Sequence, residues 1–155
     1  MDFRKAEIND ISQLVEMRLG YLEEDHGLLT QEEITKIRDS LPAYYEKHLG
    51  RDMMIYVADD GAEIVSTVFL LVVEKPANPS FITGKTGTVL NVYTKPQYRQ
   101  KGLAGKLMKM MLDEAKENKL SFVELKATKM GKPLYEKLGF NIQESIYTPM
   151  KYELS

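Results

Sequence analysis

The chain has 155 residues, a net charge of −2 and no cysteine, with 43% apolar and 28% charged residues. This length and composition are typical of one soluble domain, which we assign to residues 1–155. The lack of cysteine excludes disulfides, thiol nucleophiles and cysteine-ligated metals. The two histidines stand apart from other ligands, so no metal site is predicted.

Charge and hydropathy also limit the partners of the chain. The near balance of basic and acidic residues disfavours a nucleic-acid partner. The longest apolar stretch, residues 64–73, has only about half the length of a membrane span, so no membrane association is expected. Charged residues interrupt the first positions, which is untypical of a signal peptide, and we expect a cytoplasmic protein.

The first third of the chain is predicted to be mainly helical. A short strand at residues 3–6 precedes a helix whose apolar residues are spaced by three and four: Ile11, Leu14, Val15, Leu19 and Leu22. Thr30 and Glu33 have the spacing of a capping box and predict the start of a second helix. Pro42 is expected to kink or divide that helix.

The middle of the chain is predicted to form strands. Residues 53–58 and 63–73 flank a strong turn at Asp59-Asp60-Gly61 and read as a hairpin. Residues 75–84, with two prolines and a glycine, indicate a surface loop. A further strand is expected over residues 86–93.

The last third alternates helices and strands. We predict a helix at residues 102–118, a strand at 121–125 and a helix at 132–138 that ends at Gly139. One or two closing strands should follow, the last at residues 150–154. A hairpin-built sheet with helices between its later strands is an α+β architecture.

The segment from residue 92 to residue 106 holds the most chemical information. It places a strand end, a turn and a helix start in succession, and a helix start offers free N–H groups and the positive end of the helix dipole. Gly102 and Ala104 leave the backbone open, while Arg99, Lys101 and Lys106 add positive charge. The pattern fits a phosphate site, and it equally fits a packed helix start with solvated lysines.

Two nucleotide-binding motifs can be excluded for this segment. A Walker A loop needs a glycine where Gln100 stands and a Ser or Thr where Leu107 stands. The Rossmann fingerprint needs a glycine or alanine at Leu107, and it belongs in the first βα turn rather than two-thirds along the chain.

The same residues resemble the GNAT N-acetyltransferase superfamily. Arg99-x-x-Gly102-x-Ala104 matches its Arg/Gln-x-x-Gly-x-Gly/Ala signature, and Leu134-Tyr135-Glu136-Lys137-x-Gly139-Phe140 is similar to its second signature. The predicted order of elements matches over nearly the whole chain. The resemblance implies a mixed, mostly antiparallel sheet flanked by helices and splayed between its fourth and fifth strands.

The resemblance also implies acetyl-CoA as cofactor. It places the pyrophosphate on the turn and helix start formed by Arg99, Gln100, Lys101, Gly102, Leu103, Ala104 and Gly105. The pantetheine arm is then expected along Leu90, Asn91, Val92 and Tyr93, with Val92 or its neighbour polarising the thioester carbonyl. Thr128 and Gly131 would contact the cofactor, and Tyr135 would be the catalytic group beside the sulfur.

Two departures from the family pattern bear on activity. Thr128 stands where the family often has an asparagine, and residues 86–93 contain no carboxylate to deprotonate an amine.

Two groups of residues are candidates for binding the acceptor: the acidic run Glu23, Glu24 and Asp25, and the pair Tyr44 and Tyr45. The acidic run also fits a solvated face, and the tyrosines also fit packed rings. Proton removal through water, helped by one of these carboxylates or by His26, is an open alternative.

The sequence therefore favours an enzyme that moves an acetyl group from acetyl-CoA to a primary amine by direct attack in a ternary complex. The acceptor is a small-molecule or peptide amine, and the resemblance is compatible with a homodimer. The alternative is a non-catalytic acyl-CoA-binding or sensor module, which the missing carboxylate supports and Tyr135 opposes. A nucleic-acid-binding regulator is disfavoured by the charge balance.

Overall fold

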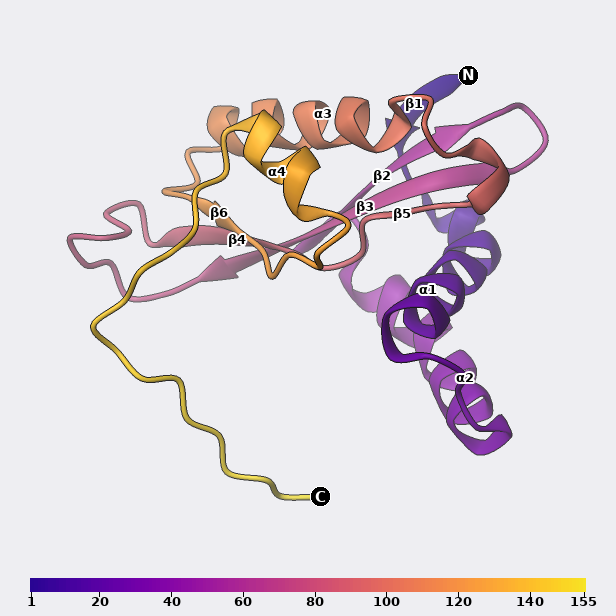
Figure 1. Cartoon of the computed structure of the whole chain (residues 1–155), viewed down its shortest axis with the longest axis horizontal. Coiled ribbons are helices and arrows are strands. Elements are labelled where there is room, and N and C mark those ends of the chain that lie inside the picture. Colours follow the sequence, from indigo (N-terminus) through magenta and orange to yellow (C-terminus); the bar gives the residue numbers. More distant parts are fainter.

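The computed structural model describes residues 1–155 and contains one mixed sheet with helices on both faces (Figure 1). The strand order is β1-β2-β3-β4-β6, with β5 paired to β3; all pairs are antiparallel except β4 with β6. The strands are β1 (Asp2–Lys5), β2 (Met53–Asp59), β3 (Ile64–Glu74), β4 (Lys85–Val89), β5 (Tyr93–Thr94) and β6 (Val123–Glu124). The α+β prediction is confirmed.

Four α-helices and two 3₁₀ turns connect the strands. They are η1 (Ile8–Asp10), α1 (Ile11–His26), α2 (Gln31–His48), η2 (Pro96–Tyr98), α3 (Leu103–Glu117) and α4 (Lys132–Leu138). In Figure 1, α1 and α2 lie on one side of the sheet, and α3 and α4 lie on the other. No helix combines the length and the apolar character that a bilayer crossing requires.

Each face of the sheet has its own apolar core because side chains alternate along the strands. On β2, Ile55 and Val57 pack with Leu14 and Tyr45 from α1 and α2. The intervening Tyr56 and Ala58 pack with the apolar face of α3, which contributes Leu103, Leu107, Met108, Met111 and Ala115. Both helical layers are therefore held against the same central strands.

The sheet opens between β4 and β6. These strands pair at only two positions, Gly87 with Val123 and Thr88 with Glu124. Leu90 still donates its N–H to the carbonyl of Phe69 at 3.0 Å; the chain then leaves the ladder at residues 91 and 92 and returns as β5 beside β3. The strand expected over residues 86–93 is thus interrupted, and the predicted splay between the fourth strand and the strand after α3 is present.

Two local predictions are wrong. Pro42 does not divide α2, which continues to His48; beyond the proline, Tyr45 is buried against Phe69 with ring centroids 6.1 Å apart. The closing strands after Phe140 are absent, because residues 141–155 extend away from the sheet without a partner strand (Figure 1). The Thr30–Glu33 capping box and the Gly139 helix end are confirmed.

Arg4 joins three elements at the edge of the sheet. Its guanidinium donates to Asp10 at 2.8 and 3.0 Å and to Asp59 at 2.9 Å, so β1, η1 and the end of β2 share one cation. These hydrogen bonds hold the pKa of both carboxyl groups below the usual range. The three side chains are mostly shielded from solvent, and Asp10 is the most buried.

We expect Arg4→Met to destabilise the protein by about 2 kcal/mol at pH 7, because two shielded carboxylates lose their charged donor. Carboxyl groups with depressed folded-state pKa values stabilise above the unfolded pKa of about 3.9, and this stabilisation is lost as pH falls through the folded-state values. Urea unfolding should therefore show that Arg4→Met lowers the free energy of unfolding strongly at pH 7 and only slightly near pH 2.

Lys36→Met provides the control, because Lys36 pairs with Glu32 on an exposed helix surface. Such a pair contributes at most about 1 kcal/mol. If both variants lowered the free energy of unfolding equally at pH 7, the role given to Arg4 would be contradicted.

Candidate functional site

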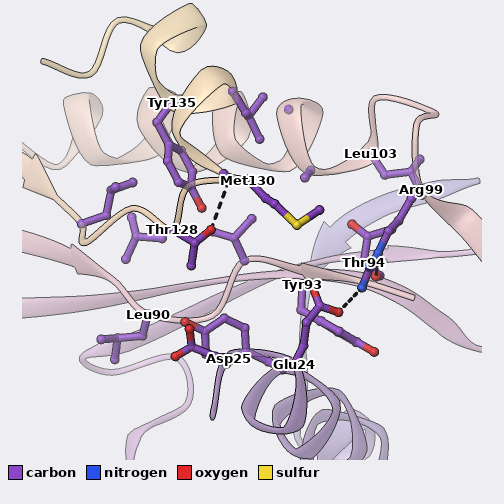
Figure 2. A pocket seen from close by; sticks show the side chains of 18 of the residues that line it. Glu24, Asp25, Leu90, Tyr93, Thr94, Arg99, Leu103, Thr128, Met130 and Tyr135 are labelled. Carbon is purple, nitrogen blue, oxygen red and sulfur yellow. Dashed lines mark hydrogen bonds and ion pairs between the residues drawn. The ribbon is translucent and has the colours of Figure 1, made fainter. Parts of the chain in front are cut away.

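A cleft of about 740 Å³ lies where β4 and β6 separate. It is bordered by the end of α1, the interrupted strand at residues 90–94, the start of α3 and the segment from residue 125 to residue 135. Figure 2 shows Tyr135 and Thr128 on one side of this space and Asp25 and Glu24 on the other. The opening in the sheet therefore brings together four segments that are distant in sequence.

The start of α3 presents free backbone donors to the cleft. Gly102, the N-cap, has a φ of +74°, and no side chain caps the helix. The N–H groups of Leu103, Ala104 and Gly105 have no acceptor within the chain, and the next one, of Lys106, bonds to the carbonyl of Gly102 at 3.1 Å. Together with the helix dipole, these donors suit an anion such as a phosphate.

The turn before α3 is held in a conformation that few residues favour. Gln100 has a φ of +62°, and Gly102 follows in the left-handed region as well. A Cβ built at Gly102 would meet nothing within 4 Å. The backbone at Gly102 is therefore open to the cleft, and only its φ strongly favours glycine.

The interrupted strand leaves a second set of free donors. The N–H groups of Asn91 and Val92 have no acceptor within the chain. The fully buried Asn91 side chain holds the interruption in place: it donates to Thr67 Oγ1 at 3.2 Å and accepts from Arg18 at 3.2 Å. Val92 lines the cleft, so its unpaired N–H is available to a ligand there.

Arg99 ties the turn before α3 to the end of α1. Its Nε donates to the carbonyl of Thr94 at 2.8 Å, and its Nη2 forms an ion pair with Glu24, drawn as a dashed line in Figure 2. Glu24 therefore has its charge matched within the chain. Asp25, one residue further on, also lines the cleft, and its Oδ2 lies 3.4 Å from Nε2 of His26.

Tyr135 and Thr128 form the opposite wall. Burial raises the pKa of the Tyr135 hydroxyl to about 12, so this phenol is protonated at neutral pH. Thr128 Oγ1 accepts the N–H of Gly131 at 3.1 Å, which leaves its proton available to another acceptor. A Cβ at Gly131 would lie 2.9 Å from the Tyr135 ring, so glycine is needed for this packing.

Most of the residues predicted to contact a cofactor line the cleft, as does Tyr135. They are Leu90, Val92, Tyr93, Arg99, Gln100, Gly102, Leu103, Ala104, Gly105, Thr128 and Gly131. Asn91 and Lys101 are not among the lining residues. Asn91 points its side chain into the protein, and the Lys101 ammonium lies 5.2 Å from the centre of the Tyr98 ring.

Only some of the predicted acceptor residues line the cleft. Glu24 and Asp25 line the cleft, whereas Glu23 is exposed outside it. Tyr44 and Tyr45 lie on α2 away from the cleft: Tyr44 stacks near His48 with ring centroids 4.5 Å apart, and Tyr45 belongs to the core. Both tyrosine rings therefore pack against other side chains and do not border the cleft.

The sequence reasoning missed Tyr21, Met130 and Leu134, which also line the cleft. Tyr21 precedes Glu24 and Asp25 by three and four residues, a spacing that places all three on one helix face and that would have identified it. Burial, followed by the charge of Asp25, raises the pKa of Tyr21. Met130 lies in the loop before α4, where no periodic pattern marks it.

Comparisons with known proteins extend over nearly the whole chain. The family model of the GNAT acetyltransferase domain matches residues 2–143. The structure is similar to a predicted acetyltransferase from Clostridium acetobutylicum crystallised with acetyl-CoA (28% identity, TM-score 0.83, covering 97% of this chain and 95% of that one). It is also similar to a GCN5-related N-acetyltransferase from Ralstonia eutropha (25% identity, TM-score 0.80, covering 96% and 97%).

A ribosomal-protein-alanine N-acetyltransferase from Brucella melitensis shares the fold at 20% identity (TM-score 0.70, covering 97% of this chain and all of that one). No curated protein matches the chain significantly.

We expect Gly102→Ala to lower the free energy of unfolding by about 1–2 kcal/mol, because alanine is strained in the left-handed region. Gly105→Ala is the matched control: it lies in the first turn of α3, and its new Cβ would meet Leu134 at an ordinary 3.6 Å. This variant should be neutral or gain up to about 1 kcal/mol. Urea unfolding of the two variants checks the contrast, and a neutral Gly102→Ala would refute it.

Proposed function

This chain belongs to the GNAT acetyltransferase family, and we propose that it transfers the acetyl group of acetyl-CoA to a primary amine. The observation that carries the proposal is the cleft, in which two sets of unpaired backbone donors and a protonated tyrosine face one space. The relative crystallised with acetyl-CoA, at 28% identity over nearly the whole chain, supports the choice of donor.

The chain's residues fit acetyl-CoA at two positions. The N–H groups at the start of α3 would hold the pyrophosphate, since they are free and lie at the positive end of the helix dipole. The free N–H groups at residues 91 and 92 would pair with the pantetheine arm. When bound, acetyl-CoA supplies an acetyl thioester whose carbonyl carbon accepts the amine and whose sulfur is the leaving group.

The chain's own groups would promote this transfer by charge stabilisation and by proton donation. The N–H of Val92 is free to donate to the carbonyl oxygen as negative charge develops on it. The Tyr135 hydroxyl would donate its proton to the departing sulfur; its pKa of about 12 keeps it protonated at neutral pH. Asp25, the cleft carboxylate without a basic Lys or Arg partner, would attract the cationic amine and receive its excess proton through water.

The experiment that tests the proposal measures thiol release from acetyl-CoA in the presence of a panel of small amines and amino-terminal peptides. The chain has no cysteine, so every thiol detected is CoA. CoA release that depends on the presence of an amine would support the proposed acetyltransferase activity. Saturable CoA binding without release by any acceptor would favour the sensor alternative, which the lack of a carboxylate on residues 85–94 motivates.

We expect Tyr135→Phe to lower turnover by about 10²- to 10⁴-fold, because general acid catalysis is lost while the ring is kept. CoA affinity by calorimetry and the melting temperature should be unchanged. Tyr44→Phe, at a half-buried tyrosine outside the cleft, is the control and should keep full turnover. A Tyr135→Phe protein with at least half of wild-type turnover, with chemistry rate-limiting, would exclude Tyr135 from the reaction.

We expect Asp25→Asn to lower kcat/KM for a cationic amine by roughly five- to tenfold at low salt, the effect of about 1 kcal/mol of attraction at a partly exposed site. High salt should reduce the difference. Glu23→Gln removes a neighbouring charge that does not line the cleft and should change kcat/KM less than twofold. Equal effects of the two substitutions would show that Asp25 acts only through net charge.

A further inference from the structure

One face of α1 presents a cation, an aromatic ring and an anion in series. Arg18, Tyr21 and Asp25 are spaced by three and four residues, so they lie in one row over about 10 Å of helix. Tyr21 and Asp25 line the cleft, and the guanidinium carbon of Arg18 lies 5.8 Å from the centre of the Tyr21 ring. Burial and the charge of Asp25 raise the pKa of Tyr21, whereas the charge of Arg18 lowers it. Both ends of the row therefore act on the same side chain.

Arg18 also lies beside the interrupted strand. Its Nη1 donates to Oδ1 of Asn91 at 3.2 Å. Asn91 stands between Leu90 and Val92, which both line the cleft. Val92 carries the free N–H that would donate to the thioester carbonyl. A ligand group bound to Arg18 would therefore lie near the segment at which the acetyl group is transferred.

The positive charge of Arg18 has no partner within the chain. Its side chain is half-buried, it forms no ion pair, and its hydrogen-bond acceptor is the neutral amide oxygen of Asn91. The chain's other arginines either pair with carboxylates or are exposed to solvent: Arg4, Arg38, Arg99 and Arg51. Shielding an unpaired charge from water is costly, so this guanidinium suits a ligand that brings an acidic group.

The free charge also indicates the kind of acidic group. A guanidinium has five N–H donors in a planar fork that matches the two oxygens of a carboxylate. Arg99 is already paired with Glu24, so Arg18 supplies the free guanidinium charge beside the cleft. A carboxylate balances that charge, whereas a phosphate ester, with a charge of about −2, would leave an excess of negative charge near Asp25.

We propose that Arg18 determines specificity by binding a carboxylate of the acceptor, which is an amino acid or another amine with an acidic group. The amine of such an acceptor points toward Asp25 and its carboxylate toward Arg18, so its two charges match the order of charges along α1. That the bound compound is acetylated rests on the proposed function, whereas carboxylate binding at Arg18 does not.

Matched acceptors test the role of the carboxylate. Glycine, γ-aminobutyrate and ε-aminocaproate are each compared with their amides, and kcat/KM is measured for wild type, Arg18→Met and Arg18→Lys. Wild type should prefer the acids. For the best acid, the acid-to-amide ratio of kcat/KM should fall by about tenfold or more in Arg18→Met, because a charge-assisted hydrogen bond is lost. The ratio should fall less in Arg18→Lys, which keeps the charge without the fork. Differences in amine basicity cancel, since every protein receives the same compounds.

Arg51→Met is the control, because it removes the same charge from an exposed arginine that does not line the cleft. Its acid-to-amide ratio should stay within about twofold of wild type, since solvent and salt screen a distant charge. If Arg18→Met melts early, Arg18→Gln, which keeps an N–H donor without the charge, replaces it. Equal losses of kcat/KM with acids and amides would mean that Arg18 only positions Asn91, and they would overturn the proposal.

Calorimetry separates this proposal from the proposed function. Protein saturated with CoA is titrated with the same acids and amides; wild type should bind the acids more tightly, and Arg18→Met should lose that preference. If no amine is acetylated, the proposed function fails, yet acid binding that depends on Arg18 still supports the carboxylate site. Acids that bind wild type no better than their amides do, or that bind Arg18→Met equally well, would overturn it.

Discussion

β4 and β6 stay paired for only two residues, Gly87 with Val123 and Thr88 with Glu124, and then separate. The base of this fork is tightly packed, since a Cβ at Gly87 would lie 2.7 Å from the Leu70 side chain. Beyond it, residues 91 and 92 leave the ladder and the chain rejoins the sheet beside β3. Backbone donors that a continuous ladder would use are therefore free, and the position of the cleft follows from this one separation.

The two sides of the cleft come from the two helical layers and have different chemistry. The start of α3, on one face of the sheet, offers backbone N–H groups and a positive dipole end. The end of α1, on the other face, carries Tyr21, Glu24 and Asp25. Arg99 connects the layers through Thr94 and Glu24, so the anion-binding and acidic sides are held at a set separation.

The sequence predicted the elements wherever local patterns are complete. The Thr30–Glu33 capping box, the Asp59-Asp60-Gly61 hairpin and the glycine that ends α4 each depend on residues a few positions apart, and all are present. Predictions failed where distant contacts matter: α2 is not divided at Pro42, and the turns beyond the proline pack on the sheet through Tyr45 and Phe69. The closing strands expected after Phe140 are not formed, and residues 141–155 have no partner strand within the chain.

The candidate site also has a part that local sequence predicts and a part that only tertiary packing decides. The sequence alone determined the family, the turn and helix start at residues 99–105, and Tyr135, because both signatures are contiguous and their backbone conformations are local. Only the tertiary structure decided that Tyr21 and Asp25 face Tyr135 across one cleft, while Tyr44 and Tyr45 pack elsewhere. The physical reason is that strand pairing and helix packing join residues more than a hundred positions apart, and no periodicity in the chain encodes that distance.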